Sequence, residues 1–174
     1  MLYILGGAAR SGKSTLARKF VDELKVPYFS VDQILIALEK GAPELGITHE
    51  QTTLERAPKL WSIFKPMLIN IYESEPEYAV DGDVLLPEYI KELSGQIKKI
   101  KACYLGYAHI DPGEKLNSIK KYDGPNNWTQ GMPDEKILQL ISSGIDFSKY
   151  LEKEAPKYNF KYFDTSFNNF QETI

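Results

Sequence analysis

A chain of 174 residues with 43% hydrophobic and 26% charged side chains can bury one core, so we expect a single domain over residues 1–174. Its net charge of −3 and the mixing of basic with acidic residues exclude the electrostatic footprint of a nucleic-acid-binding protein. With no apolar run of membrane-spanning length, no signal-peptide pattern and a single cysteine, Cys103, we expect a cytoplasmic protein with no membrane partner.

The first predicted element is a short buried strand at residues 2–5, followed by the loop sequence GAARSGKS at residues 7–14. This loop matches the pattern G-x-x-x-x-G-K-[ST] without a mismatch. Leu16, Ala17 and Phe20 then recur at helical spacing, so a helix follows the loop directly. A strand, a glycine-containing loop and a helix in this order are what a phosphate-binding loop requires, because the helix N-terminus meets the anion.

We expect the loop and the threonine after it to bind a nucleotide. Lys13 is expected at the β- and γ-phosphates, Ser14 as a ligand of Mg²⁺, and Thr15 at the α-phosphate. Backbone N–H groups from Ala9 to Ser14 are expected to hold the β-phosphate, and Arg10 can lie along the phosphates. The full set of expected nucleotide-binding residues is Gly7, Ala8, Ala9, Arg10, Ser11, Gly12, Lys13, Ser14 and Thr15.

The next predicted elements are a strand at residues 26–31 that ends at Asp32 and a helix at residues 33–40 that stops at Gly41. A long segment at residues 48–72 keeps a helical apolar stripe, and residues 48–51 resemble a capping box at its start. Because Pro58 and Pro66 interrupt this stripe, we predict two helices or one strongly kinked helix.

The second half of the chain continues to alternate strands with helices. The predicted strands are 78–80, 97–105 and 159–163, and the predicted helices are 86–94, 134–143 (stopped by Gly144), 146–157 and a short one after Asp164-Thr165-Ser166. This alternation indicates parallel βαβ units, with helices on both faces of a sheet and ligands at the carboxyl ends of its strands.

With the phosphate-binding loop at the N-terminus of a five-stranded α/β chain of this size, the sequence resembles the small P-loop kinase superfamily. That superfamily includes nucleoside monophosphate kinases, shikimate and gluconate kinases, and related antibiotic phosphotransferases. The resemblance implies the P-loop NTPase fold, an α/β three-layer sandwich whose five-stranded parallel sheet has the order 2-3-1-4-5. It also implies ATP and Mg²⁺ as cofactors, a small-molecule substrate, a helical substrate-binding segment at residues 33–75, and a lid at residues 109–133.

Three aspartates follow the second and third predicted strands. Kinases that this chain resembles carry an acid at the position of Asp32, where a carboxylate can accept or orient the proton of the acceptor hydroxyl. The alternative for Asp32 is the N-cap of the helix beginning at Gln33. In Asp81-Gly82-Asp83, Asp81 is the candidate magnesium ligand and Asp83 the candidate substrate contact, whereas the alternative is a tight acidic turn.

Arginine usage departs from the pattern of the nucleotide kinases, which use several arginines to neutralise phosphates. This chain has only Arg10, Arg18 and Arg56. Arg18 is expected on the surface, and Arg56 is expected either at the acceptor or on a solvated helix face. The predicted lid offers lysines instead, which position phosphate less rigidly than arginine does; they are Lys115, Lys120 and Lys121.

The predicted lid also contains Asn126-Asn127-Trp128-Thr129, which can bind a polar acceptor or nucleobase, or in which Trp128 can clamp the loop to the body. His49 and His109 lack metal-ligand spacing and are expected to be structural or surface residues. Asp164-Thr165-Ser166 resembles the position from which related kinases contact adenine, although a helix cap explains it equally well.

The sequence thus favours an ATP- and Mg²⁺-dependent phosphotransferase that moves the γ-phosphate to a hydroxyl of a small molecule. The expected catalytic residues are Lys13, Asp32 and Arg56, the substrate contacts Asp32, Arg56 and Asp83, and the metal ligands Ser14 and Asp81. The alternatives are a nucleoside or nucleoside monophosphate kinase, disfavoured by the shortage of arginines, and a nucleotide-dependent regulatory ATPase.

Overall fold

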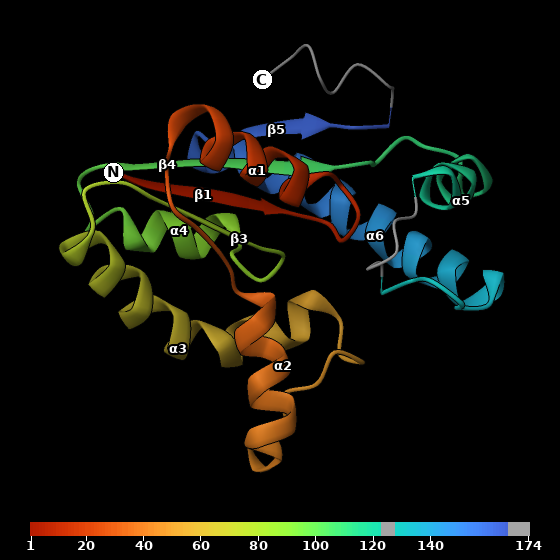
Figure 1. Cartoon of the computed structure of the whole chain (residues 1–174), viewed down its shortest axis with the longest axis horizontal. Coiled ribbons are helices and arrows are strands. Elements are labelled where there is room, and N and C mark those ends of the chain that lie inside the picture. The colour runs from red at the N-terminus through yellow and green to blue at the C-terminus, as the bar shows by residue number, and fades with distance from the viewer. Residues whose placement is uncertain (123–127, 167–174) are drawn as a thin grey trace.

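The computed structural model describes residues 1–122 and 128–166 and contains one parallel sheet (Figure 1). Its strands are β1 (Leu2–Gly7), β2 (Tyr28–Ser30), β3 (Tyr78–Gly82), β4 (Ile100–Gly106) and β5 (Lys161–Asp164). They lie in the order β2-β3-β1-β4-β5, and every neighbouring pair is parallel, which confirms the predicted fold class and strand order.

Helices connect these strands. They are α1 (Lys13–Leu24), α2 (Asp32–Gly41), α3 (Thr53–Ser74), α4 (Pro87–Leu93), α5 (Pro112–Lys121) and α6 (Asp134–Glu154), with short 3₁₀ helices η1 (Pro43–Leu45) and η2 (Ala155–Tyr158). Among the described residues, no helix is both long and apolar enough to cross a bilayer.

The two faces of the sheet are covered unequally. Successive strand residues point to opposite faces, so Ile4 packs into the larger core beneath α3, α4 and α6, whereas Leu5 joins Leu16 and Ala17 of α1 in a smaller one. In Figure 1, α1 lies on one side of the sheet, and α3 and α4 lie on the other. A sheet with both faces covered explains why the strands read as nearly continuous apolar runs.

The strand register brings the predicted site residues to one edge. Asp81 of β3 is level with Leu5 of β1 and with Ser30 of β2. The phosphate-binding loop, which follows β1, and Asp32, which follows β2, therefore leave the sheet at the same end as Asp81 and Asp83. Crossover connections between parallel strands always return the chain in this way, so every site residue from these loops collects at the carboxyl edge.

The segment containing two prolines forms one helix, α3, and it begins later than predicted. Its capping box is made by Thr52 and Glu55, not by residues 48–51, since Glu55 N–H bonds the Thr52 side chain and the Glu55 carboxylate accepts from Thr52 N–H. Pro58 and Pro66 both lie inside the helix. Burial of one helix face against the core outweighs the two missing N–H donors, as most helix stability comes from such packing.

The predicted break at Gly144 is wrong, because α6 runs without interruption from Asp134 to Glu154. Gly144 is buried, and a Cβ atom there would overlap the hydroxyl of Tyr107. The glycine thus permits a close approach between α6 and the residue after β4, and does not end a helix. The predicted lid also contains a helix, α5, that periodicity did not reveal.

Candidate active site at the carboxyl edge of the sheet

The loop at residues 7–14 is curled so that its backbone faces the start of α1. Gly7 and Gly12 have φ values of 146° and 97°, and a Cβ on Gly7 would overlap the backbone of Leu105. Gly12 is the N-cap of α1 and provides no side-chain cap, and the first turn contains no acid. The positive end of the helix and its first N–H groups therefore fit an anion, as a phosphate-binding loop requires.

Lys13 and Ser11 add side chains to this cradle. The buried Lys13 ammonium donates to the carbonyl oxygens of Gly7 at 2.9 Å and Ala8 at 2.8 Å, which holds it over the loop. The hydroxyl of Ser11 is buried and has no hydrogen-bond partner among the described residues. A phosphate in the loop would meet a fixed cation and an unsatisfied hydroxyl, so the residues fit a nucleotide phosphate chain.

The predicted metal ligands lie around a tyrosine that the sequence did not single out. The Tyr28 hydroxyl donates to Oδ1 of the buried Asp81 at 2.8 Å, and Ser14 lies close enough to influence the pKa of Tyr28. Burial, and then the charge of Asp81, raise the pKa of Tyr28 to about 12, so it remains a donor at neutral pH. A hydroxyl and a carboxylate brought together in this way are the oxygen donors that Mg²⁺ prefers.

Asp32 is the first residue of α2, and the N-cap is Val31, which makes no side-chain cap bond. The capping alternative for Asp32 is therefore wrong. The Asp32 side chain is exposed to solvent on one side. Desolvation of its carboxyl group by the surrounding protein atoms is nevertheless the largest cause of its raised pKa, which is about 6. The nearby charge of Asp83 raises this pKa further, whereas Lys13 opposes the shift.

Arg56 and Asp83 form an ion pair between α3 and the residues after β3, with side chains only 10% and 13% exposed. The solvated-face alternative for Arg56 is therefore wrong. Thr53 donates to the same carboxylate oxygen, Oδ2, at 2.8 Å, and Arg56 also donates to the carbonyl of Gln51 at 2.7 Å. These bonds fix both side chains beside Asp32, whose pKa responds to each of them.

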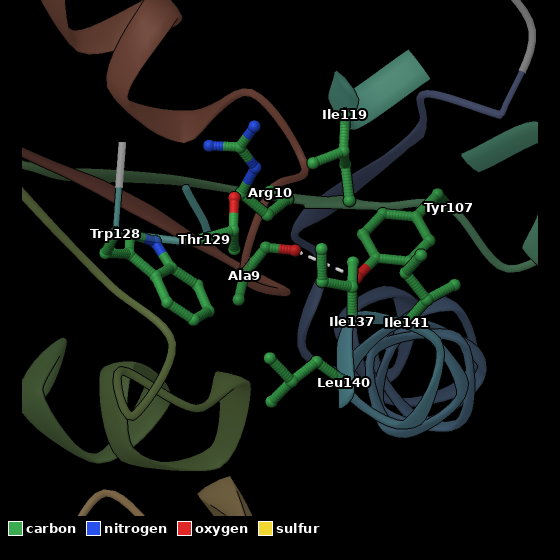
Figure 2. Close-up of a pocket in the computed structure, with 9 residues that line it drawn as sticks. All are labelled: Ala9, Arg10, Tyr107, Ile119, Trp128, Thr129, Ile137, Leu140 and Ile141. Carbon is green, nitrogen blue, oxygen red and sulfur yellow. Dashed lines mark hydrogen bonds between the residues drawn. The ribbon is translucent and has the colours of Figure 1, made fainter. Parts of the chain in front are cut away.

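On the opposite side of the loop, α5 contacts the loop backbone. The Lys115 ammonium donates to the Arg10 carbonyl at 2.9 Å and lies 4.1 Å from the centroid of the Tyr107 ring. Tyr107 in turn donates to the Ala9 carbonyl at 2.9 Å, the dashed line in Figure 2. Burial, assisted by the charge of Arg10, lowers the pKa of Lys115 to about 8. Lys115 of α5 therefore holds the backbone of the phosphate-binding loop at Arg10.

The other predicted lid residues do not converge on the loop in the same way. Lys120 pairs with Asp134, and Lys121 lies over the ring of Tyr122. Trp128 is 58% exposed and lines a small pocket with Ala9 and Arg10, on the far side of that pocket from Tyr107 (Figure 2). It therefore does not act as a buried clamp. Residues 126 and 127 lie outside the part of the chain that the structure describes.

The histidines are on the surface, as expected. His49 pairs with Glu39, and the His109 ring lies 2.9 Å from the Glu152 carboxylate. Asp164 accepts from the N–H groups of Ala108 at 2.9 Å and Ser166 at 2.8 Å, so it ties the end of β5 to the residues after β4. The helix expected after residue 166 lies outside the described residues.

A comparison with solved structures finds chains of the same fold. Shikimate kinase from Acinetobacter baumannii in complex with shikimate aligns with a TM-score of 0.51 and 16% identity, over 96% of this chain and 84% of that one. A protein from Chloroflexus aurantiacus described as a kinase gives 0.50 and 16%, over 99% and 90%, and an uncharacterized protein from Eubacterium ventriosum gives 0.50 and 12%, over 95% and 88%. No family model and no curated protein matches the sequence.

These structures have little sequence in common with this chain, so the likeness is one of fold. The strand order and the all-parallel sheet described above match that fold. The chain therefore has the shikimate kinase-like P-loop NTPase fold.

Proposed function

We propose that this chain is an ATP- and Mg²⁺-dependent phosphotransferase that moves the γ-phosphate to a hydroxyl group of a small molecule. One observation supports this most strongly: Asp32 leaves the sheet at the same edge as the phosphate-binding loop and Asp81, and its pKa, raised to about 6, responds both to Lys13 of that loop and to the Arg56–Asp83 pair. The carboxylate therefore lies between the groups suited to phosphate and those suited to an acceptor, with a pKa near that of an effective base at neutral pH.

Each residue has a distinct role in this proposal. The acceptor hydroxyl loses its proton to the Asp32 carboxylate as its oxygen bonds to the γ-phosphorus, and the bond from that phosphorus to the oxygen of ADP breaks. Lys13 stabilises the charge on the phosphoryl oxygens, and Arg56 positions the acceptor side through its pair with Asp83. Ser14 and Asp81 would hold Mg²⁺, which neutralises phosphate charge and orients the phosphate chain.

A nucleotide kinase is less well supported by the geometry. Such an enzyme needs cations at a second phosphate group, but Arg56 is engaged by Asp83, and Lys115 is engaged by the Arg10 carbonyl and the Tyr107 ring. A regulatory ATPase needs no carboxylate on the acceptor side, whereas Asp32 occupies such a position. We therefore place the acceptor near Asp32, Arg56 and Asp83.

The test is an assay of ADP release with ATP, Mg²⁺ and a panel of hydroxyl-containing metabolites. We expect release to depend on an acceptor, and Lys13→Ala to reduce kcat by at least a hundredfold, on the scale of losing a transition-state charge contact. Arg18→Ala, which changes an exposed arginine of the same helix, is the control and should leave turnover near the wild-type rate. ADP release that is the same with and without every acceptor would favour the ATPase and contradict the proposal.

A further inference from the structure

The arginine on the acceptor side is already neutralised by the protein. Arg56 and Asp83 pair through Nη2 and Oδ2, and Thr53 and Gln51 hold the pair in place. The chain has no other arginine beyond residue 18. The planar guanidinium group of Arg56, which could bind a carboxylate or phosphate on the acceptor, is therefore already paired with Asp83.

From this pairing we propose that the acceptor is an uncharged or amine-bearing polyol, and that the site rejects acceptors carrying a carboxylate or phosphate group. The inference rests on the proposed function, since it names the substrate class of that same site. Specificity of this kind comes as much from repelling the wrong charge as from attracting the right one.

The charges around Asp32 agree with this assignment. Three carboxylates, Asp32, Asp81 and Asp83, face two cations, Lys13 and Arg56, and the net effect of these charges and of desolvation is to disfavour the ionised form of Asp32. An anionic acceptor would add a further negative charge and raise the pKa of Asp32 further, which would favour the protonated form and weaken the base. An ammonium group would lower that pKa and keep the base ionised.

Burial also keeps the pair from an anionic group of the acceptor. Oδ1 of Asp83 and Nε of Arg56 are buried and have no hydrogen-bond partner within residues 1–122 and 128–166. The Arg56 residue as a whole is only 8% exposed. Because neither atom has exposed surface, the pair is enclosed by the protein and does not present a free guanidinium fork to an anionic group of the acceptor.

The experiment compares acceptors that share a carbon skeleton and differ in charge. Glucose, glucosamine and gluconate form one set, and uridine and uridine monophosphate form another. We expect kcat/KM for the neutral or amine member to exceed that for the acid by at least tenfold. Asp83→Asn, which frees Arg56, should reduce this ratio at least tenfold, because the acid gains a partner and the amine loses one. Glu73→Gln, the same charge change on an exposed residue of α3, should leave the ratio unchanged.

Binding is measured separately from turnover, so that this inference and the proposed function can fail independently. The same compounds are titrated into the wild-type protein with Mg²⁺ and ADP, and backbone amide NMR signals report binding. Binding of the neutral or amine compounds without phosphate transfer supports the inference and contradicts the kinase. Preference for the acids, an unchanged ratio in Asp83→Asn, or binding of no neutral or amine compound would overturn the inference.

Discussion

Asp32 combines an unfavourable environment with a position suited to catalysis. Its carboxyl is desolvated and lies near Asp83, and no cap bond to the backbone compensates. A group held in this way costs stability in its ionised form, and strongly perturbed groups of this kind are concentrated at functional sites. Asp32 is therefore the residue at which activity and stability are expected to oppose each other.

We predict that Asp32→Asn abolishes transfer and raises the melting temperature at pH 7 to 8 only slightly, because solvent screens the charge of this exposed side chain. The native pKa of about 6 lies above the ordinary 3.8, so the native state binds this proton more tightly, and wild-type stability falls as pH rises from about 4 to 6. The stability gain of the variant should therefore disappear below about pH 4. Calorimetry over this range tests the prediction, with exposed Asp22→Asn as the control.

The same ionisation sets the pH dependence of the wild-type enzyme. If Asp32 accepts the hydroxyl proton, kcat/KM should fall with unit slope below about pH 6, because the base becomes protonated. A rate that stays constant down to pH 4.5, in a protein shown by circular dichroism to be folded, would remove Asp32 from proton transfer.

Tyr28 is hydrogen-bonded to Asp81, one of the two expected magnesium ligands, and lies near Ser14, the other. We predict that Tyr28→Phe raises the Mg²⁺ concentration needed for half-maximal activity several-fold, because Asp81 loses the hydroxyl that orients it. It should also cost about 1.5–3 kcal/mol of unfolding free energy, the range for a lost hydrogen bond to a charged group. Tyr3→Phe removes a hydroxyl bonded to Glu77 and is the matched control. An unchanged Mg²⁺ requirement would contradict the proposed role.

At the scale of elements, the loop is supported by helices that come much later in the chain. Tyr107, directly after β4, donates to the Ala9 carbonyl, and α6 makes room for its hydroxyl at Gly144. Lys115 of α5 donates to the Arg10 carbonyl. The conformation of the loop is therefore determined jointly by β1, α5 and α6, and changes in α6 should reach the nucleotide site.

We predict that Gly144→Ala destabilises the protein by about 1–3 kcal/mol, the usual cost of overpacking, despite alanine's better helix propensity. The displaced Tyr107 would lose its bond to Ala9, so nucleotide affinity should fall as well. Urea unfolding and nucleotide titration test this. The exposed Ser143→Ala should change stability by less than about 0.5 kcal/mol. Tyr107→Phe, which removes the overlapping oxygen, should recover part of the loss in the double variant.

At the scale of the whole molecule, the site assembles only when the sheet is complete, because β1, β2 and β3 each deliver a part of it. A nucleotide should therefore bind the folded state of the chain and not the unfolded state. At a hundred times its Kd, a non-hydrolysable ATP analogue with Mg²⁺ should add about 2.7 kcal/mol to the unfolding free energy. Lys13→Ala should remove most of this gain, and a wild-type protein whose melting temperature does not respond to millimolar nucleotide would contradict nucleotide binding.

The sequence alone was sufficient to predict the fold class, which the structure confirms, and to locate the phosphate-binding loop between β1 and α1. A contiguous motif, apolar periodicity and alternating elements are local signals, and crossover handedness leaves few ways to arrange parallel strands. The loop and the carboxyl-edge position of Asp32, Asp81 and Asp83 therefore followed from reading along the chain, whereas the strand order followed from the resemblance to the small P-loop kinases. The ends of individual helices were predicted less accurately, because tertiary packing outweighed the helix-breaking tendency of Pro58, Pro66 and Gly144.

Only the tertiary structure decided which charges are paired. Arg56 and Asp83 are 27 residues apart, Tyr28 and Asp81 are 53 apart, and Lys115 lies 105 residues from the carbonyl that it bonds. Nothing local distinguishes these residues from solvated ones, because a pair forms only when strands and helices distant in sequence pack together. The pairing of Arg56 with Asp83 depends on that packing, and so does the inference that the acceptor carries no negative charge.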